Sequence, residues 1–488
     1  MQSQKDNDVW STASRLRFVV VGGGIAGLSA AFRLWREVKQ LNVPAEVLLF
    51  EGSPRVGGCI STYNLDDTIL ELGPDSFITE KPAGLALCKE LGIEHRLIGT
   101  DKNNRRTFVA HKEKLYPLPE GFLMMAPTKI MPMLKSPLFS WDAKLRMMQE
   151  MFIPPAAPDI DESLAQFVDR RLGREVLDRV VQPLVGGIYT SDPDKLSVKA
   201  ALPKMVQLEQ KYGSLIKGLG ATNGKDNEDA SGARYGMFVS FDEGMNVLVN
   251  QLVSSLPQGT IQTHSLVSKV RQVKESKAWE VEFFDGKKME ADGVVIATSS
   301  YHAADIVYEL DALLSHNLRK IPYASSAVLN LIYRRSDIPH ALDGFGFVVP
   351  RTEKRTIIAC SFSSIKWPGR APADKVLMRV FVGGALQPDV YDLTDEQIEC
   401  LMWEDLHTYL GIRSVPVLSV ISRFPRAMPQ YNLGHLAMLK EIDESVAKLP
   451  GLAIAGNAYT GIGIPDCIAS GERAAATILQ AAASRAHS

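Results

Sequence analysis

The segment that most constrains the fold runs from Phe18 to Ala31 and reads FVVVGGGIAGLSAA. Its apolar start predicts a buried strand, its three consecutive glycines a tight turn, and its alanine-rich end a helix. Gly22 permits the turn, Gly24 lets a pyrophosphate approach the backbone, and Gly27 lets the helix pack closely against the strand. The free N–H groups at the helix start would face the phosphates. The segment therefore predicts a dinucleotide-binding unit.

A second apolar run, 47–50, ends at Glu51, where a carboxylate would accept hydrogen bonds from an adenosine ribose. Arg55 then precedes another glycine turn, Gly57-Gly58. Nicotinamide enzymes do not need a second phosphate-facing turn at this point, whereas FAD enzymes of the glutathione-reductase and amine-oxidase types commonly have one. The pattern E-x-x-x-R-x-G-G thus resembles the FAD-dependent amine oxidase superfamily and favours FAD over a surface loop with a chance Gly-Gly pair.

A third glycine-rich region lies near the other end of the chain. The run 452–457 predicts a buried strand that ends at Gly456-Asn457, and 468–483 predicts a helix whose first turn begins near Pro465. Gly463 and Ile464 lie just before that helix. A helix N-terminus against the flavin would stabilise the negative charge of reduced flavin. The alternative is an ordinary C-terminal strand followed by a capped helix.

Composition excludes several classes of protein. A formal net charge of -2 gives no reason to expect a nucleic-acid partner. The five cysteines form no CxxC pair, which favours free thiols in a reducing compartment, and the nine histidines show no metal-ligand spacing. The first 14 residues lack the features of a secretory or transit signal, and no apolar run is long enough to span a bilayer. We expect a cytoplasmic protein that is soluble or peripheral on the cytoplasmic membrane.

A chain of 488 residues suggests about three domains. We predict an α/β (α+β) fold in which the domains are interleaved. A Rossmann-like FAD-binding domain takes 16–80, 236–300 and 415–484, and a helical domain takes 81–209. A mixed-sheet substrate domain takes 301–414 with parts of 70–80 and 210–240.

Three internal motifs are more specific than the glycine turns: GPDSF at 73–77, MPQYNLGH at 428–435 and GIGIPDCI at 461–468. Together with 197–203, 241–245 and 344–350, they resemble the oxygen-dependent porphyrinogen oxidases of haem synthesis, from about residue 17 to 480. The resemblance implies an FAD enzyme that removes six electrons from a porphyrinogen in three two-electron steps, with oxygen reoxidising the flavin and hydrogen peroxide released.

The substrate within that family stays open. A single propionate-binding arginine, Arg106, favours the oxidation of protoporphyrinogen IX to protoporphyrin IX, because this substrate has only two propionates. The sequence GIPDCI instead resembles that of bacterial enzymes that convert coproporphyrinogen III to coproporphyrin III. Two more distant alternatives are another amine-oxidase-type flavoenzyme, such as a polyamine or carotenoid oxidoreductase, and a flavin-bound scaffold without turnover.

The resemblance also implies site residues. The flavin and the substrate carry the chemistry, so no acid–base residue is expected, and His435 is more simply a structural residue than a base. Substrate contacts are expected at Arg106, Gly187, Leu342 and Phe381, although the sequence GIYTSDP after Gly187 departs from relatives with Ala-Gly before Asp-Pro. Expected FAD contacts are Gly22, Gly24, Gly27, Glu51, Arg55, Gly57, Gly58, Gly73, Val267, Gly456, Asn457, Gly463 and Ile464.

The segment 105–153 combines methionines and other apolar residues with eight Lys/Arg against four acids. This mixture suits shallow membrane docking, which the resemblance also implies for the helical domain, and a core helix with a solvated face is the alternative. The expected partners are then the porphyrinogen, oxygen and a membrane surface. A homodimer is the common default, and a ferrochelatase is the candidate for receiving the product.

Overall fold

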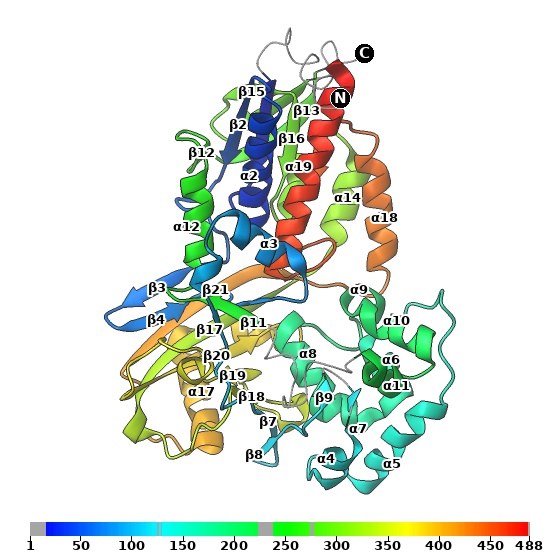
Figure 1. Ribbon diagram of the computed structural model, residues 1–488, viewed down its shortest axis with the longest axis vertical. Coiled ribbons are helices and arrows are strands. Elements are labelled where there is room, and N and C mark those ends of the chain that lie inside the picture. The colour runs from blue at the N-terminus through cyan, green and yellow to red at the C-terminus, as the bar shows by residue number, and fades with distance from the viewer. Residues whose placement is uncertain (1–15, 124–125, 128, 223–237, 274–277, 487–488) are drawn as a thin grey trace.

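The computed structural model describes residues 16–123, 126–127, 129–222, 238–273 and 278–486. A parallel sheet flanked by long helices forms one end of an elongated molecule, and a larger sheet and a group of shorter helices lie side by side at the other end (Figure 1). Among the described helices, none combines the length and the apolar character needed to cross a membrane. The first 15 residues lie outside the described part of the chain, so the structure does not address the expectation drawn from them.

The glycine turns belong to a five-stranded sheet in which every pair of neighbouring strands is parallel. Its order is β12 (Ile261–Gln262), β2 (Ala45–Phe50), β1 (Leu16–Val21), β16 (Gly293–Ile296) and β22 (Leu452–Ile454). Strand β16 is buried along its whole length and β1 is buried from Phe18 to Val21, as their continuous apolar sequences predict. Because the strands are parallel, the segments that follow β2, β1, β16 and β22 all emerge at one edge of the sheet.

Two helices cover one face of this sheet, α2 (Ile25–Gln40) after the first glycine turn and α19 (Ile464–Ala486) near the end of the chain (Figure 1). They pack very closely where they cross. A Cβ atom at Gly471 of α19 would overlap the carbonyl oxygen of Ala26 and would lie 3.1 Å from the backbone nitrogen of Ala30. Glycine is therefore required at position 471 for the two backbones to meet.

The second sheet has seven strands, and its two faces have different surroundings. Residues at alternate positions of the strands β17 (Tyr323–Arg334) and β20 (Lys375–Gly383), such as Leu329 and Val380, enter a hydrophobic core that includes helix α17 (Asp395–Leu410). The other face carries Asn330, Arg379 and Phe381 toward the parallel-sheet domain. The strand order is β21 (Leu418–Pro429), β17 (Tyr323–Arg334), β20 (Lys375–Gly383), β19 (Ala359–Ser361), β18 (Gly346–Val348), β7 (Thr107–His111) and β8 (Lys114–Pro117).

The helical group surrounds a core of its own and a buried cluster of ion pairs around Arg171. Arg171 and Glu150, both completely buried, pair with each other, and Glu150 also accepts hydrogen bonds from the Ser214 hydroxyl and from the Leu215 N–H at 2.8 Å. The carboxylate thus joins three segments of the group. Its helices are α4 (Ile130–Lys135), α5 (Trp141–Gln149), α6 (Leu164–Leu172), α7 (Arg174–Val176), α8 (Gln182–Tyr189), α9 (Val198–Ala201), α10 (Pro203–Tyr212) and α11 (Leu215–Thr222), with the short strands β9 (Phe122–Leu123) and β10 (Ala126–Pro127).

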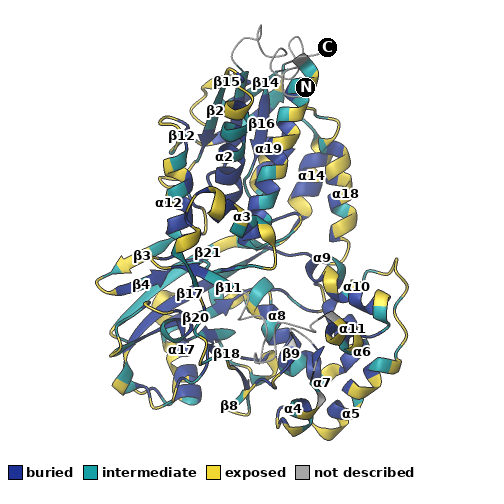
Figure 2. Cartoon of the chain, viewed as in Figure 1, coloured by how far each residue is buried: buried dark blue, intermediate teal, exposed yellow. Residues whose placement is uncertain are grey.

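The remaining elements connect or cover these parts, and Figure 2 shows their solvent-facing sides. They are the strands β3 (Thr62–Leu65), β4 (Thr68–Glu71), β5 (Phe77–Ile78), β6 (Leu97–Gly99), β11 (Phe238–Phe241), β13 (Val267–Gln272), β14 (Trp279–Phe283) and β15 (Lys288–Ala291), and the helices α3 (Pro82–Glu90), α12 (Asn246–Ser255), α13 (Ser300–Ile306), α14 (Ala312–Lys320), α15 (Ser363–Lys366), α16 (Pro388–Tyr391), α17 (Asp395–Leu410) and α18 (His435–Val446).

The predicted mixed α/β architecture is confirmed, but the predicted helical segment 81–209 contains two strands of the seven-stranded sheet. β7 holds the run Phe108-Val109-Ala110, pairs in parallel with β18 and forms a hairpin with β8. Likewise β21, from the segment assigned to the FAD-binding domain, pairs along most of its length with β17. The pairing of β7 with β18 and the pairing of β21 with β17 both join segments that lie far apart in the chain. Local periodicity does not reveal such pairings. The exact division into three domains stays a prediction.

Replacing Gly471 with Ala is expected to destabilise the protein by about 1–3 kcal/mol, because the added methyl overlaps the α2 backbone. Urea unfolding followed by circular dichroism measures this change. Gly220→Ala in α11 is the control, because a Cβ there meets no atom within 4 Å. That variant should be neutral or slightly more stable, since alanine favours a helix. Equal stabilities of the two variants would contradict the close packing of α2 and α19.

Candidate functional site

The first glycine turn leaves open space at one of its three expected contacts. Gly22 has a φ of 105°, and a Cβ there would lie 2.8 Å from the carbonyl oxygen of Ala297. A Cβ at Gly27 would overlap the carbonyl oxygen of Gly22. At Gly24, the residue that caps α2, a Cβ would meet nothing within 4 Å. Gly22 and Gly27 are thus required by the protein itself, whereas Gly24 leaves room for a ligand at the helix start.

The second glycine turn docks directly on the first. The Gly57 N–H donates to the carbonyl oxygen of Gly23 at 2.8 Å, and Gly57 and Gly58 both have positive φ, at 104° and 58°. The Arg55 guanidinium donates to the carbonyl oxygens of Gly58 at 2.7 Å and Ile60 at 3.0 Å. Arg55 therefore holds the shape of its own turn.

Glu51 follows β2 and reaches back to the first turn. One carboxylate oxygen accepts from the Gly23 N–H at 2.6 Å and the other from the Ser53 N–H at 2.8 Å. The Glu51 carbonyl oxygen accepts from the Ser265 N–H at 2.8 Å, which brings the buried Val267 at the start of β13 to this end of the sheet. The structure thus places Glu51 and Val267 together on the β2 side of the turn, where the adenosine end was expected.

On the opposite side of the first turn, the loop after β22 leads into α19. The Gly456 N–H donates to the Ser470 hydroxyl at 3.1 Å, and the Gly463 N–H donates to the Asp466 carboxylate at 3.1 Å. Ile464 begins α19 and is buried. Asn457 donates from its side-chain amide to the carbonyl oxygen of Ala427 at 3.3 Å. Loops from the two ends of the chain therefore meet at one edge of the parallel sheet.

Tyr431 connects two parts of this loop, a role that the sequence did not reveal. Its buried hydroxyl donates to the carbonyl oxygen of Asn457 at 2.6 Å and accepts from the Gly461 N–H at 2.8 Å. Burial raises the pKa of Tyr431 well above its usual range, so the hydroxyl keeps its proton. His435 stacks on the Tyr431 ring at 4.2 Å, and its Nε2 lies 3.2 Å from the carbonyl oxygen of Tyr459. Burial lowers the pKa of His435. These contacts favour the structural role expected for His435.

Gly73 lies beside the second glycine turn and is held by a buried charge network. A Cβ at Gly73 would overlap the carbonyl oxygen of Cys59, and the Arg379 guanidinium donates to the Gly73 carbonyl oxygen. Arg379 and Lys366 also pair with Asp75, at 3.4 and 3.3 Å. Burial raises the pKa of Asp75, but the two cations outweigh it and hold this pKa well below its usual range. Asp75 is therefore ionised, and the network fixes Gly73.

The four expected substrate residues lie on different elements. Arg106 precedes β7, is mostly exposed, and pairs with Asp343 at 2.9 Å. Leu342 is next to Asp343 but is buried in the core of the seven-stranded sheet, with a φ of 56°. Phe381 lies on the sheet face that carries Arg379, whose guanidinium is 5.3 Å from the Phe381 ring. Gly187 is exposed in α8, and a Cβ there would meet no atom within 4 Å. Their joint role as substrate contacts stays a prediction.

Comparisons with known proteins assign the family. The family model of flavin-containing amine oxidoreductases matches residues 25–479. The chain belongs to this family. It is 35% identical to coproporphyrinogen III oxidase of Bacillus subtilis, over 94% of this chain and 97% of that protein, and 30% identical to protoporphyrinogen oxidase 1 of Spinacia oleracea, over 94% and 84%. A crystal structure from Exiguobacterium sp. 255-15 that carries a protoporphyrinogen oxidase name matches with a TM-score of 0.83 at 28% identity, over 96% and 99%.

The protein is therefore an FAD-dependent oxidoreductase, as the two glycine turns predicted. The residues present fit this cofactor, because the open space at Gly24 lies between the Glu51 side and the α19 side of the same edge. The glycine turns would hold the pyrophosphate, Glu51 the ribose, and the α19 N-terminus the flavin end. Which of the expected contacts touch FAD stays a prediction.

A pair of glycine substitutions separates cofactor binding from folding. Gly24→Ala is expected to leave the stability of the FAD-free protein within about 0.5 kcal/mol of wild type, because the methyl enters open space. The same methyl occupies the expected phosphate position, so we expect FAD affinity to fall at least tenfold, or about 1.4 kcal/mol. Gly27→Ala should instead lose about 1–3 kcal/mol of stability, because its methyl overlaps the Gly22 carbonyl.

Urea unfolding of the FAD-free variants and fluorescence titration with FAD measure the two quantities separately. Unchanged FAD affinity in Gly24→Ala would contradict the placement of the pyrophosphate at the first turn.

Proposed function

We propose that this FAD enzyme is a porphyrinogen oxidase that converts coproporphyrinogen III to coproporphyrin III with oxygen as the electron acceptor. The observation that carries this proposal is similarity over nearly the whole chain to proteins with porphyrinogen oxidase names, among which coproporphyrinogen III oxidases reach 35% and 31% identity. The motifs at 73–77, 428–435 and 461–468 carry the resemblance, and they contain Gly73, Tyr431 and the first turn of α19, which lie at the proposed cofactor site.

Charge beside Arg106 supports coproporphyrinogen III as the favoured substrate. A surface groove next to Arg106 is lined by three further cations, Lys102, Arg105 and Lys135, and by one acid, Glu120. Glu120 already pairs with Lys129. A groove with this excess of positive charge suits a substrate with more carboxylates, whereas a lone Arg106 favoured protoporphyrinogen IX. Protoporphyrinogen IX stays the alternative, because Asp343 engages Arg106.

The protein's part in the proposed reaction is to position, orient and exclude water. Bound FAD supplies hydride acceptance and a route for electrons to the acceptor. Arg379 fixes the Gly73 loop, and Tyr431 fixes the loop before α19. Phe381 offers an aromatic ring on the face of the seven-stranded sheet that also carries Arg379. Neither Tyr431 nor His435 is suited to act as a general base, because Tyr431 keeps its proton and His435 is packed against its ring.

Anaerobic reduction of the flavin tests the function directly. Mixing the holoenzyme with coproporphyrinogen III without oxygen should bleach the flavin absorbance within turnover time, and admitting oxygen should restore it with one hydrogen peroxide per two electrons. Protoporphyrinogen IX should react with a lower kcat/KM. Flavin that neither porphyrinogen reduces would exclude the proposed function.

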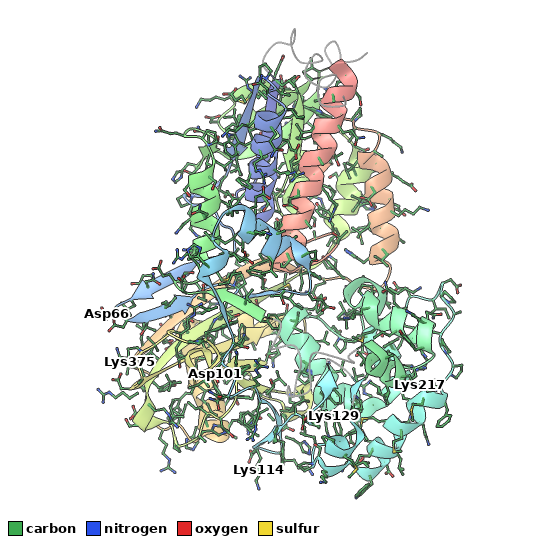
Figure 3. All side chains as sticks on the ribbon, viewed as in Figure 1. Asp66, Asp101, Lys114, Lys129, Lys217 and Lys375 are labelled. Carbon is green, nitrogen blue, oxygen red and sulfur yellow. The ribbon has the colours of Figure 1, made fainter. Side chains whose placement is uncertain are left out.

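Arg106→Ala supplies the matched variant for substrate binding. We expect KM to rise about tenfold with unchanged flavin content, because a charge-assisted contact to a propionate is lost. Lys114→Ala, which removes an exposed cation from β8 outside the groove, should change neither quantity (Figure 3). An unchanged KM in Arg106→Ala would remove this residue from the substrate site.

We also propose that the helical end of the molecule docks on a membrane surface. Four large apolar side chains, Trp141, Leu145, Met148 and Phe152, follow the spacing of one helix face along α5 and the turn after it. They are 70%, 59%, 37% and 83% exposed, which is unusual for neighbouring residues of this size. Lys129 and Lys217 lie on the same helical end of the molecule (Figure 3). An exposed apolar face at an end of the molecule that also carries cations suits shallow insertion among anionic lipids.

Vesicle binding tests this docking. Trp141→Ser combined with Phe152→Ser should abolish most co-sedimentation with vesicles that contain anionic lipid, because both apolar anchors are lost. The control combines Phe284→Ser with Val415→Ser, which removes side chains that are 81% and 78% exposed elsewhere on the molecule. Equal binding by both double variants would rule out α5 as the docking face. The homodimer and the transfer of product to a ferrochelatase stay predictions.

A further inference from the structure

Arg426 lies in an irregular part of β21, close to the loops of the cofactor site. Between Ala324 and Ser326 the register of β17 advances by two residues, while β21 advances by four, from Met428 back to Phe424. Arg426 lies in the extra stretch with a φ of 44°, and its N–H donates to the Ser325 hydroxyl at 3.0 Å. Such a bulge turns a side chain away from its regular direction along the strand.

The bulge places Arg426 beside helix α13, and it places the next residue, Ala427, beside the loop after β22. Its guanidinium carbon lies 3.9 Å from the centre of the Tyr301 ring, and the Tyr301 hydroxyl donates to the Arg426 carbonyl oxygen at 3.3 Å. Tyr301 follows β16 by a few residues. The next residue, Ala427, accepts the hydrogen bond from the Asn457 side chain after β22. Arg426 and Ala427 thus contact the segments that follow β16 and β22, the two strands on the α19 side of the first glycine turn.

The guanidinium of Arg426 has no polar partner among the residues that the structure describes. Its contact is the face of Tyr301, and its N–H groups point to no carboxylate or carbonyl there. Arginine on the same strand behaves differently, because Arg423 pairs with Asp395 at the surface and donates to two carbonyl oxygens. Arg426 is an exposed cation that is fixed in direction by stacking but unsatisfied as a donor.

Among the residues that the structure describes, two cations near the glycine turns, Arg55 and Lys81, already have protein partners. The Arg55 guanidinium donates hydrogen bonds to carbonyl oxygens of its own turn, and Lys81 pairs with Asp466 at the start of α19. His302 is also nearby, but burial lowers its pKa, which favours the neutral ring over a cation. A pyrophosphate carries two negative charges, which glycine N–H groups and one helix N-terminus offset only in part.

We propose that Arg426 binds the pyrophosphate of FAD, with its guanidinium oriented by the ring of Tyr301. The planar fork of N–H donors matches two phosphate oxygens, and the stacked ring reduces the freedom that the side chain loses on binding. The contact joins the seven-stranded sheet to the cofactor, since β21 belongs to that sheet. This inference concerns FAD binding and is independent of which porphyrinogen is oxidised.

FAD titration of the cofactor-free protein tests the contact. Arg426→Ala should weaken FAD binding about ten- to a hundredfold, which is the effect of losing hydrogen bonds to a charged group. Arg426→Lys should recover part of the affinity, because the charge remains but the fork is lost. Tyr301→Ala should weaken binding less than Arg426→Ala. Arg413→Ala, which removes an exposed cation just before β21, is the control and should bind FAD as wild type does.

Two further ligands distinguish a pyrophosphate contact from a structural role. ADP carries the same diphosphate as the adenosine half of FAD, whereas adenosine carries none. Arg426→Ala should weaken ADP binding by a similar factor and leave adenosine binding unchanged. Weaker FAD binding with unchanged ADP binding would overturn the proposal, as would equal loss for ADP and adenosine. Urea unfolding of each cofactor-free variant shows whether the substitution has damaged the fold. A loss of FAD affinity that comes only from such damage would also overturn the proposal.

Discussion

The parallel pairing of β1 with β2 on one side and β16 on the other determines where the cofactor loops lie. The segment that follows each strand emerges at the same edge of the sheet. Residues 22, 51, 298 and 456 therefore lie at one edge although they are far apart in the chain. The close contact of Gly471 with α2 completes this arrangement, because it brings the helix that begins at Ile464 alongside the helix that begins at Ile25. Without that pairing, the glycine turns would be three unrelated loops.

The parts of the site that the sequence revealed are those with a local cause. A glycine that must adopt positive φ, or must lie against a neighbouring backbone, is visible in the sequence because no other residue fits. The parts that were missed join distant residues through single contacts. Arg379 meets Gly73 across 306 positions, and Tyr431 meets Asn457 across 26. No periodicity predicts such a pair, although the MPQY motif could have drawn attention to Tyr431 as a buried hydroxyl.

The same distinction explains the fold. The strands of the parallel sheet were predictable, because their apolar runs are continuous and end at glycine or an acid. The strands β7 and β8 were not, because they lie in a segment rich in helices and join the sheet through the pairing of β7 with β18, more than 200 residues later. Local sequence sets what an element can be, whereas its neighbours in space decide which of the permitted structures forms.

The wide separation in sequence between the two walls of the cofactor site has a consequence for how the enzyme matures. The glycine turn at 22–24 is synthesised long before its opposite wall, which is formed by residues 456–464 and by the helix that follows them. A nascent chain on the ribosome can therefore build β1 and α2 but cannot enclose the isoalloxazine until α19 has also emerged. Flavin loading then has to wait for α19, and a chain interrupted before residue 464 would lack one wall of its flavin pocket.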